Sequence, residues 1–172
     1  DHAKMSAQAA FRTKILFDTN QLLQRAKSEE EILSQTASQL MKLLNRSLIV
    51  YPEQNGELGS EQVFEMDGEV PCNIFSAPEE RDAANWTFAN KKRSGAGTDS
   101  YPDAKGLYLA LRTGGGVFGV IGIDLSEKPL DAFENSVLLS ILGEGALAIE
   151  NRRNALEKEQ AALQARNEEL RA

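Results

Sequence analysis

Apolar residues recur at helical spacing through the first quarter of the chain, which predicts two consecutive helices. The first is expected over residues 11–26, where apolar side chains lie three or four positions apart. Ser28 and Glu31 form a capping box, so we expect a second helix to start there and continue to Leu44. Residues 1–10 are polar and rich in alanine without a clear period, and we expect them to be a tail.

Short apolar runs between turn residues follow, and they are typical of β-strands. Residues 48–51 are rich in β-branched side chains, and residues 63–66 form a second such run. Residues 78–89 begin with a proline and have the composition of a helix. Residues 94–106 contain glycines and a proline, which indicates a loop. The pattern in residues 71–76 is ambiguous.

The next segment has the pattern of a β-hairpin. Residues 107–111 place leucines on one face and Tyr108 and Ala110 on the other, which is the alternation of a strand. A threonine and three glycines at positions 113–116 supply the turn. Residues 117–123 are apolar on both faces, so we expect a central strand that is covered on both sides.

A long helix is predicted from Asp131, and its broad apolar stripe should pack on the sheet. Further along, the stripe narrows to one apolar residue every seven positions, the spacing of a coiled coil with a partner helix. The expected dimer and signalling seam consists of Leu142, Ile149, Leu156, Leu163 and Leu170. The complementary core position is polar, at Arg153, Gln160 and Asn167. Half of the seam is therefore polar, which predicts a weak coil that shifts easily in register.

Composition narrows the classes of function. The chain has 172 residues and a net charge of −7, which argues against nucleic acid as a partner because phosphate contacts need a dominant basic face. It holds one histidine, His2, and one cysteine, Cys72. We therefore expect no metal site and no cofactor, and we interpret Cys72 as a small buried hydrophobic residue.

No apolar run in the sequence approaches the roughly 20 residues of a membrane span, and no signal peptide opens the chain. We therefore expect no membrane contact by this stretch. We interpret the chain as a fragment excised from a longer protein.

Two glycine patterns and one basic run could also carry chemistry. Residues 114–119 match the dinucleotide-binding spacing G-x-G-x-x-G, but they lead into a strand, so a hairpin turn is the better interpretation. Residues 143–148 match it inside a helix, where close helix packing explains the glycines. The basic run at 91–93 could grip a phosphate or carboxylate, although cations also favour a solvated helix end.

The most unusual stretch combines aromatic rings with glycines and small polar residues. Such a combination suits a pocket for a small ligand or a monovalent cation, because glycines admit backbone and short polar side chains offer oxygens. The residues expected to line this pocket are Trp86, Phe88, Gly97, Thr98, Asp99 and Tyr108. The alternative is a helix tip whose aromatic rings fill the core under an irregular loop.

The order of predicted elements resembles that of GAF domains, and a set of local motifs narrows the resemblance. These motifs are Trp86-x-Phe88, Gly95-x-Gly97-Thr98-Asp99, Pro102, Leu107-Tyr108-Leu109 and Gly119-x-x-Gly122. They look like the GAF-type module of KdpD-type sensor histidine kinases, the membrane sensors that control high-affinity potassium uptake. The likeness is strongest over residues 84–123, and Ala110 departs from it where the family usually has proline.

The resemblance implies an α+β fold: a central antiparallel sheet packed by N-terminal helices and a long C-terminal signalling helix. We expect the helices on one face of the sheet and loops on the other. Residues 11–150 would form the sensory domain, and residues 151–172 would be a coiled-coil helix leading to a kinase core. The family also implies that the chain is a cytoplasmic domain of a bacterial protein anchored in the inner membrane.

Several functional hypotheses follow. The domain could bind a small ligand and bias the helix that leads to the kinase, or it could be a ligand-free relay and dimerisation module. A GAF domain of another sensor kinase that binds a small nucleotide is a further alternative. The expected partners are a second copy, through the C-terminal helix, and the other domains of the parent kinase. We expect no catalysis by this stretch, because it contains no phosphoacceptor histidine box and Cys72 has no resolving thiol.

Overall fold

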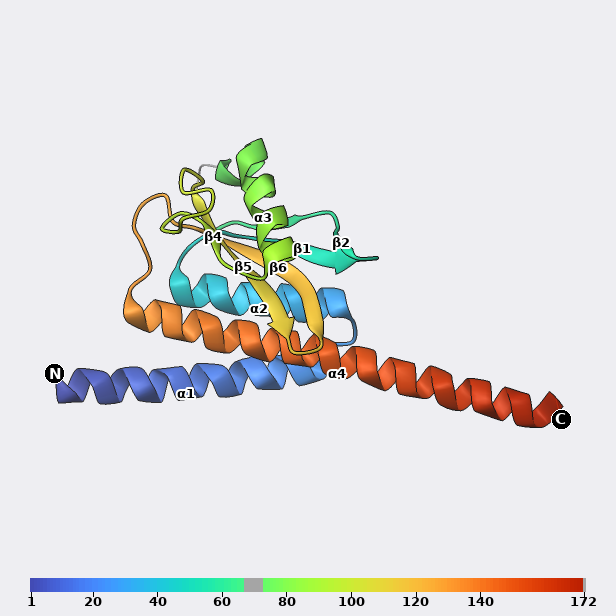
Figure 1. The fold of residues 1–172 in the computed structure, drawn as a ribbon. Helices are drawn as coiled ribbons and strands as arrows, with labels where there is room; N and C mark the ends of the chain where they lie inside the picture. The colour runs from blue at the N-terminus through green and yellow to red at the C-terminus, as the bar shows by residue number, and fades with distance from the viewer. Residues whose placement is uncertain (67–72, 172) are drawn as a thin grey trace.

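An antiparallel sheet lies at the centre of the structure and is covered on both faces (Figure 1). This computed structural model describes residues 1–66 and 73–171. In chain order the elements are α1 (His2–Arg25), α2 (Glu29–Leu44), β1 (Leu48–Gln54), β2 (Glu57–Leu58), β3 (Gln62–Phe64), a short 3-10 helix η1 (Ile74–Ser76), α3 (Pro78–Asn90), β4 (Ser94–Gly95), β5 (Gly106–Thr113), β6 (Gly116–Asp124) and α4 (Ala132–Arg171). Cys72 lies outside the described residues.

The strands are arranged in the order β2-β1-β6-β5-β4, and β3 pairs with β1 beside this row. Strand β6 lies between β1 and β5 and is mostly buried, which confirms the prediction of a central strand. Alternate side chains of β5 point to opposite faces of the sheet. Leu109 accordingly belongs to the core on one face and Tyr108 to a separate cluster on the other, as the alternation predicted.

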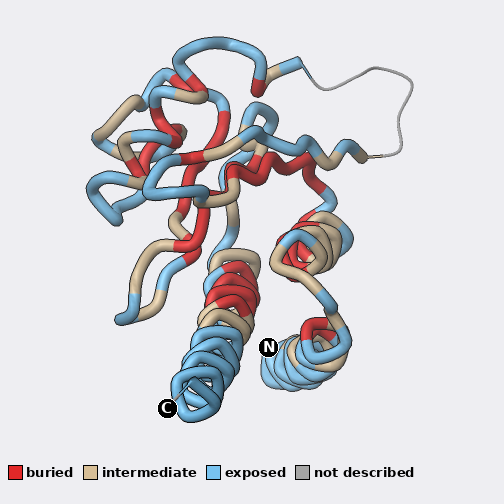
Figure 2. The backbone as a smooth tube through the Cα atoms, turned by 90° about the vertical axis from the view of Figure 1, so that its right-hand side faces the viewer, coloured by how far each residue is buried: buried red, intermediate tan, exposed pale blue. Residues whose placement is uncertain are grey.

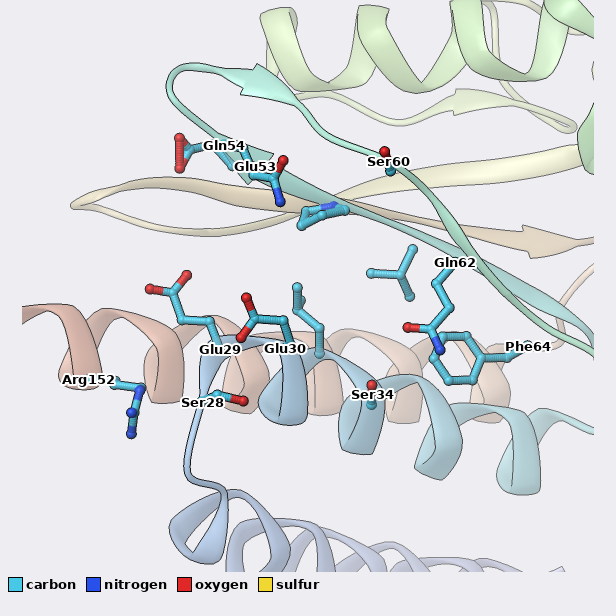
Figure 3. Close-up of a pocket in the computed structure, with 13 residues that line it drawn as sticks. Ser28, Glu29, Glu30, Ser34, Glu53, Gln54, Ser60, Gln62, Phe64 and Arg152 are labelled. Carbon is cyan, nitrogen blue, oxygen red and sulfur yellow. The ribbon is translucent and has the colours of Figure 1, made fainter.

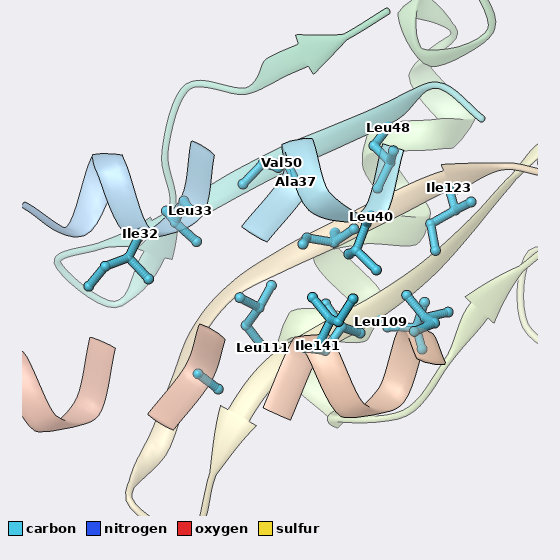
Figure 4. Packing of buried hydrophobic residues seen from close by; sticks show 14 of the residues in the cluster. Ile32, Leu33, Ala37, Leu40, Leu48, Val50, Leu109, Leu111, Ile123 and Ile141 are labelled. Atoms are coloured by element: carbon cyan, nitrogen blue, oxygen red, sulfur yellow. The ribbon is translucent and has the colours of Figure 1, made fainter. Parts of the chain in front are cut away.

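Helices α2 and α4 cover one face of the sheet and form the larger core with it (Figure 4). Leu40 of α2, Leu111 of β5 and Ile141 of α4 are each 0% exposed and belong to this one cluster. Burial of such apolar surface is the main driving force for folding. Helix α1 packs against α2 and α4 on their side away from the sheet, so it forms a further layer (Figures 1 and 2).

Helix α3 covers the opposite face of the sheet together with the loops around it (Figure 1). The expectation that only loops lie on this face was therefore wrong. The small side chains of Ala83 and Ala84 let α3 approach the sheet closely enough to bury both residues completely. They share a cluster with Tyr51, Tyr108 and Val120 of the sheet.

Helix α1 begins at His2, so residues 2–10 are helical where a tail was expected. Alanine-rich sequence has a high intrinsic helix propensity even when it shows no apolar period. The Asp1 side chain also accepts a hydrogen bond from the backbone N–H of Ala3 and caps the first turn. Further along, the ring of Phe11 lies 6.5 Å from that of Phe133 at the start of α4.

Helix α4 is continuous over its 40 residues, which corresponds to about 60 Å at 1.5 Å per residue. Its first half packs on the sheet and its last turns project beyond the domain (Figure 1). By length and composition alone it contains a stretch that could span a membrane, contrary to the sequence-based expectation. In this structure 39% of that stretch is buried inside the domain.

The predicted seam is divided between two environments. Leu142 and Ile149 are 5% and 0% exposed, because they pack in the domain's own core. They are therefore not available to a partner helix, and the seam prediction has to be corrected at these two positions. Leu156, Leu163 and Leu170 are 43%, 53% and 79% exposed on the projecting part of α4.

Candidate functional site

A cluster of charged side chains marks the point where α4 leaves the domain. The guanidinium of Arg153 on α4 donates to both carboxylate oxygens of Glu29 on α2, at 3.0 and 2.9 Å. It also donates to the carboxylate of Glu53 on β1, at 3.1 Å. Its carbon Cζ lies 5.0 Å from the centre of the Phe118 ring on β6. This Arg153 cluster therefore ties α4 to one helix and two strands.

The sequence pattern assigned Arg153 to the polar half of a coiled-coil seam. In the structure its side chain instead points back to its own domain and is engaged by two carboxylates. These hydrogen bonds, first of all those to Glu29, raise the pKa of Arg153, so the guanidinium stays charged. Two parallel hydrogen bonds from a guanidinium to one carboxylate fix the relative orientation of the two groups as well as the distance between them. The position of α4 relative to α2 is therefore well defined here.

Local sequence explains why Glu29 lies in the first turn of α2. The side chain of Ser28 accepts a hydrogen bond from the N–H of Glu31 at 3.1 Å, and the Glu31 carboxylate accepts one from the N–H of Lys27 at 2.8 Å. The serine half of the predicted capping box is thus formed, whereas Glu31 bonds the N–H of Lys27 and not that of Ser28. Helix α2 begins at Glu29. A carboxylate in the first turn is also favoured by the helix dipole.

A cleft of about 500 Å³ opens beside this cluster, between α2 and the strands β1 and β3 (Figure 3). We call it the α2–β1 cleft. Its lining is mixed, with apolar side chains such as Leu33 and Phe64 and polar ones such as Ser34 and Gln62. Its size and mixed lining suit a small organic molecule. Glu29 and Glu53 line the cleft and also hold Arg153, so the cleft and the root of α4 share two side chains.

The residues predicted to form a ligand pocket lie in different environments. Trp86 and Phe88 are half-buried, and Phe88 packs against the core cluster beneath α3. Gly97 and Asp99 are exposed, and the hydroxyl of Thr98 contacts two backbone carbonyl oxygens of its own loop at 2.8 Å.

Gly97 and Thr98 line a shallow pocket next to the start of α4, on the other side of the sheet from Tyr108. The structure therefore does not gather the six residues around one cavity. Ligand binding by these residues stays a prediction.

Tyr108 is fully buried, and its hydroxyl has a hydrogen-bond partner inside the domain. It donates to the carboxylate of Glu80 at 2.7 Å, and Glu80 also accepts the backbone N–H groups of Lys105 and Gly106 at 3.0 and 2.9 Å. Burial and the hydrogen bond to Glu80 raise the pKa of Tyr108 far above the usual range. A Cβ atom on Gly122 would lie 2.4 Å from the Tyr108 ring, so this glycine makes room for the ring.

Sequence reasoning assigned Glu80 only a favourable place in the first turn of a helix. The structure buries it to 3% exposure, whereas its neighbour Glu79 is exposed. The sequence shows two adjacent glutamates and no sign of which one faces inward. Burial also raises the pKa of the nearby Tyr51 to about 12, with Arg81 stacked 5.3 Å from the centre of its ring.

Glu144 lies on α4 in a groove of about 400 Å³ beside the end of α1, which Arg152 and Glu159 also line. Its Oε2 atom is buried and has no hydrogen-bond partner among the described residues. Burial raises the pKa of Glu144 above its usual value. The folded state therefore holds this proton more tightly than the unfolded state does. The resulting contribution to stability is largest below the unfolded pKa and falls as pH rises through the folded pKa.

We expect Glu144→Gln to unfold at a higher temperature than the wild-type chain at pH 7, because the amide carries no charge into the groove. The difference should shrink toward about pH 4, where the wild-type carboxyl is largely protonated. Thermal unfolding followed by circular dichroism at both pH values measures this. Glu157→Gln, at an exposed position of the same helix, is the control and should show no such gain. A lower unfolding temperature for Glu144→Gln at pH 7 would contradict the assignment.

Among residues 1–66 and 73–171, no group of three or more histidine, cysteine, aspartate or glutamate side chains is placed to hold a metal ion. The candidate functional site therefore consists of the Arg153 cluster and the adjacent α2–β1 cleft.

No known family profile matches the chain. The sensor protein KdpD from Clostridium acetobutylicum is 30% identical to it over 162 residues, which are 94% of this chain and 18% of that protein. The chain thus spans about a fifth of the length of this relative.

Solved structures with the same fold include the GAF domain of the potassium sensor histidine kinase KdpD from Escherichia coli. It has a TM-score of 0.62 and 22% identity, and the match covers 88% of this chain and 99% of that domain. The far-red absorbing dark state of JSC1_58120g3, with bound biliverdin IXα, has a TM-score of 0.53 and 14% identity over 80% of this chain and 98% of that one. The expected α+β GAF-like fold is therefore confirmed. The chain therefore has the fold of a GAF domain, and its sequence is similar to part of a KdpD sensor protein.

Proposed function

We propose that this domain is the sensory and relay domain of a sensor histidine kinase, and that α4 is its output helix. Similarity to a KdpD sensor protein over nearly the whole chain supports the first part. The Arg153 cluster supports the role of α4 as the output helix. It holds α4 at the last half-buried turn, beyond which the helix projects from the domain. A change in the domain that alters this cluster also alters how α4 leaves it.

The kinase activity in this proposal belongs to the parent protein and not to this domain. The Escherichia coli neighbour is named a potassium sensor histidine kinase, which supports a role of the parent protein in regulating potassium-uptake genes. In that arrangement the domain lies in the cytoplasm of a bacterium, and the parent protein is anchored in the inner membrane.

The arrangement of the two long helices supports a relay. Helices α1 and α4 lie side by side and run in the same direction (Figure 1). Phe11 contacts Phe133, and the guanidinium of Arg12 donates to the Ser140 hydroxyl at 3.1 Å. A displacement of α1 along its axis is therefore transmitted to α4 through direct contacts. Small shifts of packed helices are a common form of switching.

Dimerisation is part of the same proposal. Leu156, Leu163 and Leu170 form an exposed stripe at heptad spacing on the projecting part of α4. A parallel pair of such helices buries this stripe, and the polar residues at the complementary position keep the association weak. The Arg153 cluster lies directly before the stripe, so it sets the rotation with which α4 enters the pair.

We expect Arg153→Ala to change basal autophosphorylation of the full-length parent kinase by on the order of tenfold, within the usual range of allosteric coupling. We also expect it to remove most of the response to potassium, because α4 is no longer held by Glu29 and Glu53. Phosphate incorporation from labelled ATP in membranes measures both.

The control for this experiment is Arg166→Ala, at an exposed arginine of the projecting helix. Glu29→Gln, which weakens the same cluster from the other partner, should reproduce the Arg153→Ala result. Wild-type basal activity and wild-type potassium response in a correctly folded Arg153→Ala kinase would show that the cluster does not relay the signal.

A further inference from the structure

Gly143 is an interior residue of α4 for which packing gives no reason. A glycine inside a helix destabilises it relative to alanine, so a close neighbour usually explains its presence. Gly145 has such a neighbour, because a Cβ atom there would lie 2.7 Å from the Thr36 hydroxyl. A Cβ atom on Gly143 would meet nothing within 4 Å. The explanation by close helix packing therefore holds for Gly145 and fails for Gly143.

The space left by Gly143 belongs to a pocket of about 260 Å³ between α4, β5 and the end of α3. Its apolar part comes from Leu109 and Ala110 of β5 and from Leu139 and Leu142 of α4. Leu139 is 49% exposed, so apolar surface in this pocket is open to solvent. The pocket can therefore hold the apolar part of a small molecule.

Four positively charged residues complete the lining of the pocket, and none of the described residues that line it is acidic. Lys91, Lys92 and Arg93 follow α3, and Arg112 comes from β5. None of the four forms an ion pair with a carboxylate in the part of the chain that the structure describes. Among the described residues, Arg93 donates to the neutral side-chain oxygen of Asn135, at 2.8 Å.

This concentration of uncompensated positive charge occurs in a chain of net charge −7. The dipole at the end of α3 favours the cations at positions 91–93, but it does not account for Arg112, which lies on a strand. The acidic α2–β1 cleft shows the contrast, since three glutamates line that cleft. The basic pocket is thus opposite in charge to the α2–β1 cleft.

We propose that this pocket binds a small organic anion that carries one phosphate or carboxylate group and a short apolar body. The cations would hold the charged group, and the leucines together with the space above Gly143 would take the body. Phosphate and carboxylate are the groups whose geometry the arginine fork matches best. Because the pocket is confined to a few residues and the chain is acidic overall, a nucleic acid does not fit this surface. Binding of such an anion does not require that the domain belongs to a kinase.

Titration of the chain with phenyl phosphate, hexanoate and inorganic phosphate tests the proposal, with amide resonances observed by NMR. We expect phenyl phosphate or hexanoate to shift resonances of residues 109–112 and 139–143, and inorganic phosphate to bind at least about tenfold more weakly because it lacks an apolar body. The first two probes distinguish a phosphate site from a carboxylate site. Arg112→Ala should weaken binding on the order of tenfold, as expected for loss of a charged hydrogen bond.

Gly143→Leu is the decisive variant, because it fills the pocket and leaves all four cations in place. Leucine has a higher helix propensity than glycine, and the position is open, so the unfolding temperature should not fall. We expect this variant to lose binding of the organic anions. Lys158→Ala, on the projecting part of α4, is the matched control for charge and should bind like the wild-type chain. Equal binding of all three anions, unchanged binding by Gly143→Leu, or no binding of either organic anion would overturn the proposal and leave only a basic surface patch.

Discussion

Glu80→Ala is expected to lower the free energy of unfolding by roughly 3–5 kcal/mol, because two buried donors and one part-buried donor lose their shared acceptor, and each unsatisfied buried group costs about 1–3 kcal/mol. The donors are the Tyr108 hydroxyl and the backbone N–H groups of Lys105 and Gly106, and Glu80 itself is 3% exposed. Domains of this kind have a total stability of only about 5–15 kcal/mol. The loss therefore removes a large share of the stability.

Urea unfolding at neutral pH measures this loss. Glu79→Ala is a matched control, because Glu79 precedes Glu80 in the same helical turn and is exposed. Glu79→Ala should change the free energy of unfolding by no more than a few tenths of a kcal/mol, as is usual at surface positions. The double variant Glu80→Ala with Tyr108→Phe should lose less free energy of unfolding than the sum of the losses of the two single variants. Tyr108→Phe removes one of the donors that Glu80→Ala leaves without an acceptor. Equal effects of Glu79→Ala and Glu80→Ala would contradict this account.

The features that the sequence predicted well depend on periodicity over a whole element. The alternation in residues 107–111 placed the leucines and Tyr108 on opposite faces of the sheet, as the structure has them. The two-sided apolar run at residues 117–123 predicted the central strand β6. Such patterns are readable because burial on one face of an element constrains many positions in the same way. The start of α1 at His2 was missed because this part of the helix is almost entirely exposed and has no apolar period.

The functional features were harder to predict because they join residues that are far apart in the chain. Ser34 and Phe64 line one cleft although thirty positions separate them. Arg153 meets Glu29 because α4, which follows the whole sheet in the chain, passes beside the first turn of α2. The pocket was predicted from residues that are close together in the sequence. In the structure the sheet separates two of them, Thr98 and Tyr108. Proximity along the chain is thus a poor guide to which side chains share a cavity.

The heptad pattern shows how one period can serve two purposes. Leu142 and Ile149 continue the spacing of the exposed leucines, yet they pack against the sheet of their own domain. The period of an α-helix that lies on a sheet and that of a coiled coil differ by only about 0.1 residue per turn, so a short stretch fits both. A turn of α4 that lies on the sheet packs in the domain's own core, and a turn beyond the sheet is free to pair with a second helix.

This division of the helix leads to a second large expected effect. Ile149→Ala should lower the free energy of unfolding by about 2–5 kcal/mol, the usual range for truncation of a fully buried isoleucine. Ile149 is 0% exposed and belongs to the larger core of the domain, so the loss should not depend on protein concentration. Leu163→Ala, at a 53% exposed heptad position, should leave the unfolding of the sheet domain unchanged and weaken only the association of two chains.

Two measurements separate these roles. Urea unfolding at two protein concentrations tenfold apart reports the stability of the domain, and sedimentation equilibrium reports the association. The result expected for Ile149→Ala is an earlier unfolding transition that is displaced equally at both concentrations. If Ile149→Ala instead weakened association while the domain unfolded as in the wild-type chain, Ile149 would belong to the seam between two copies. In that case the whole heptad from Leu142 onward would act between chains, and α4 would have to leave the sheet to form the pair.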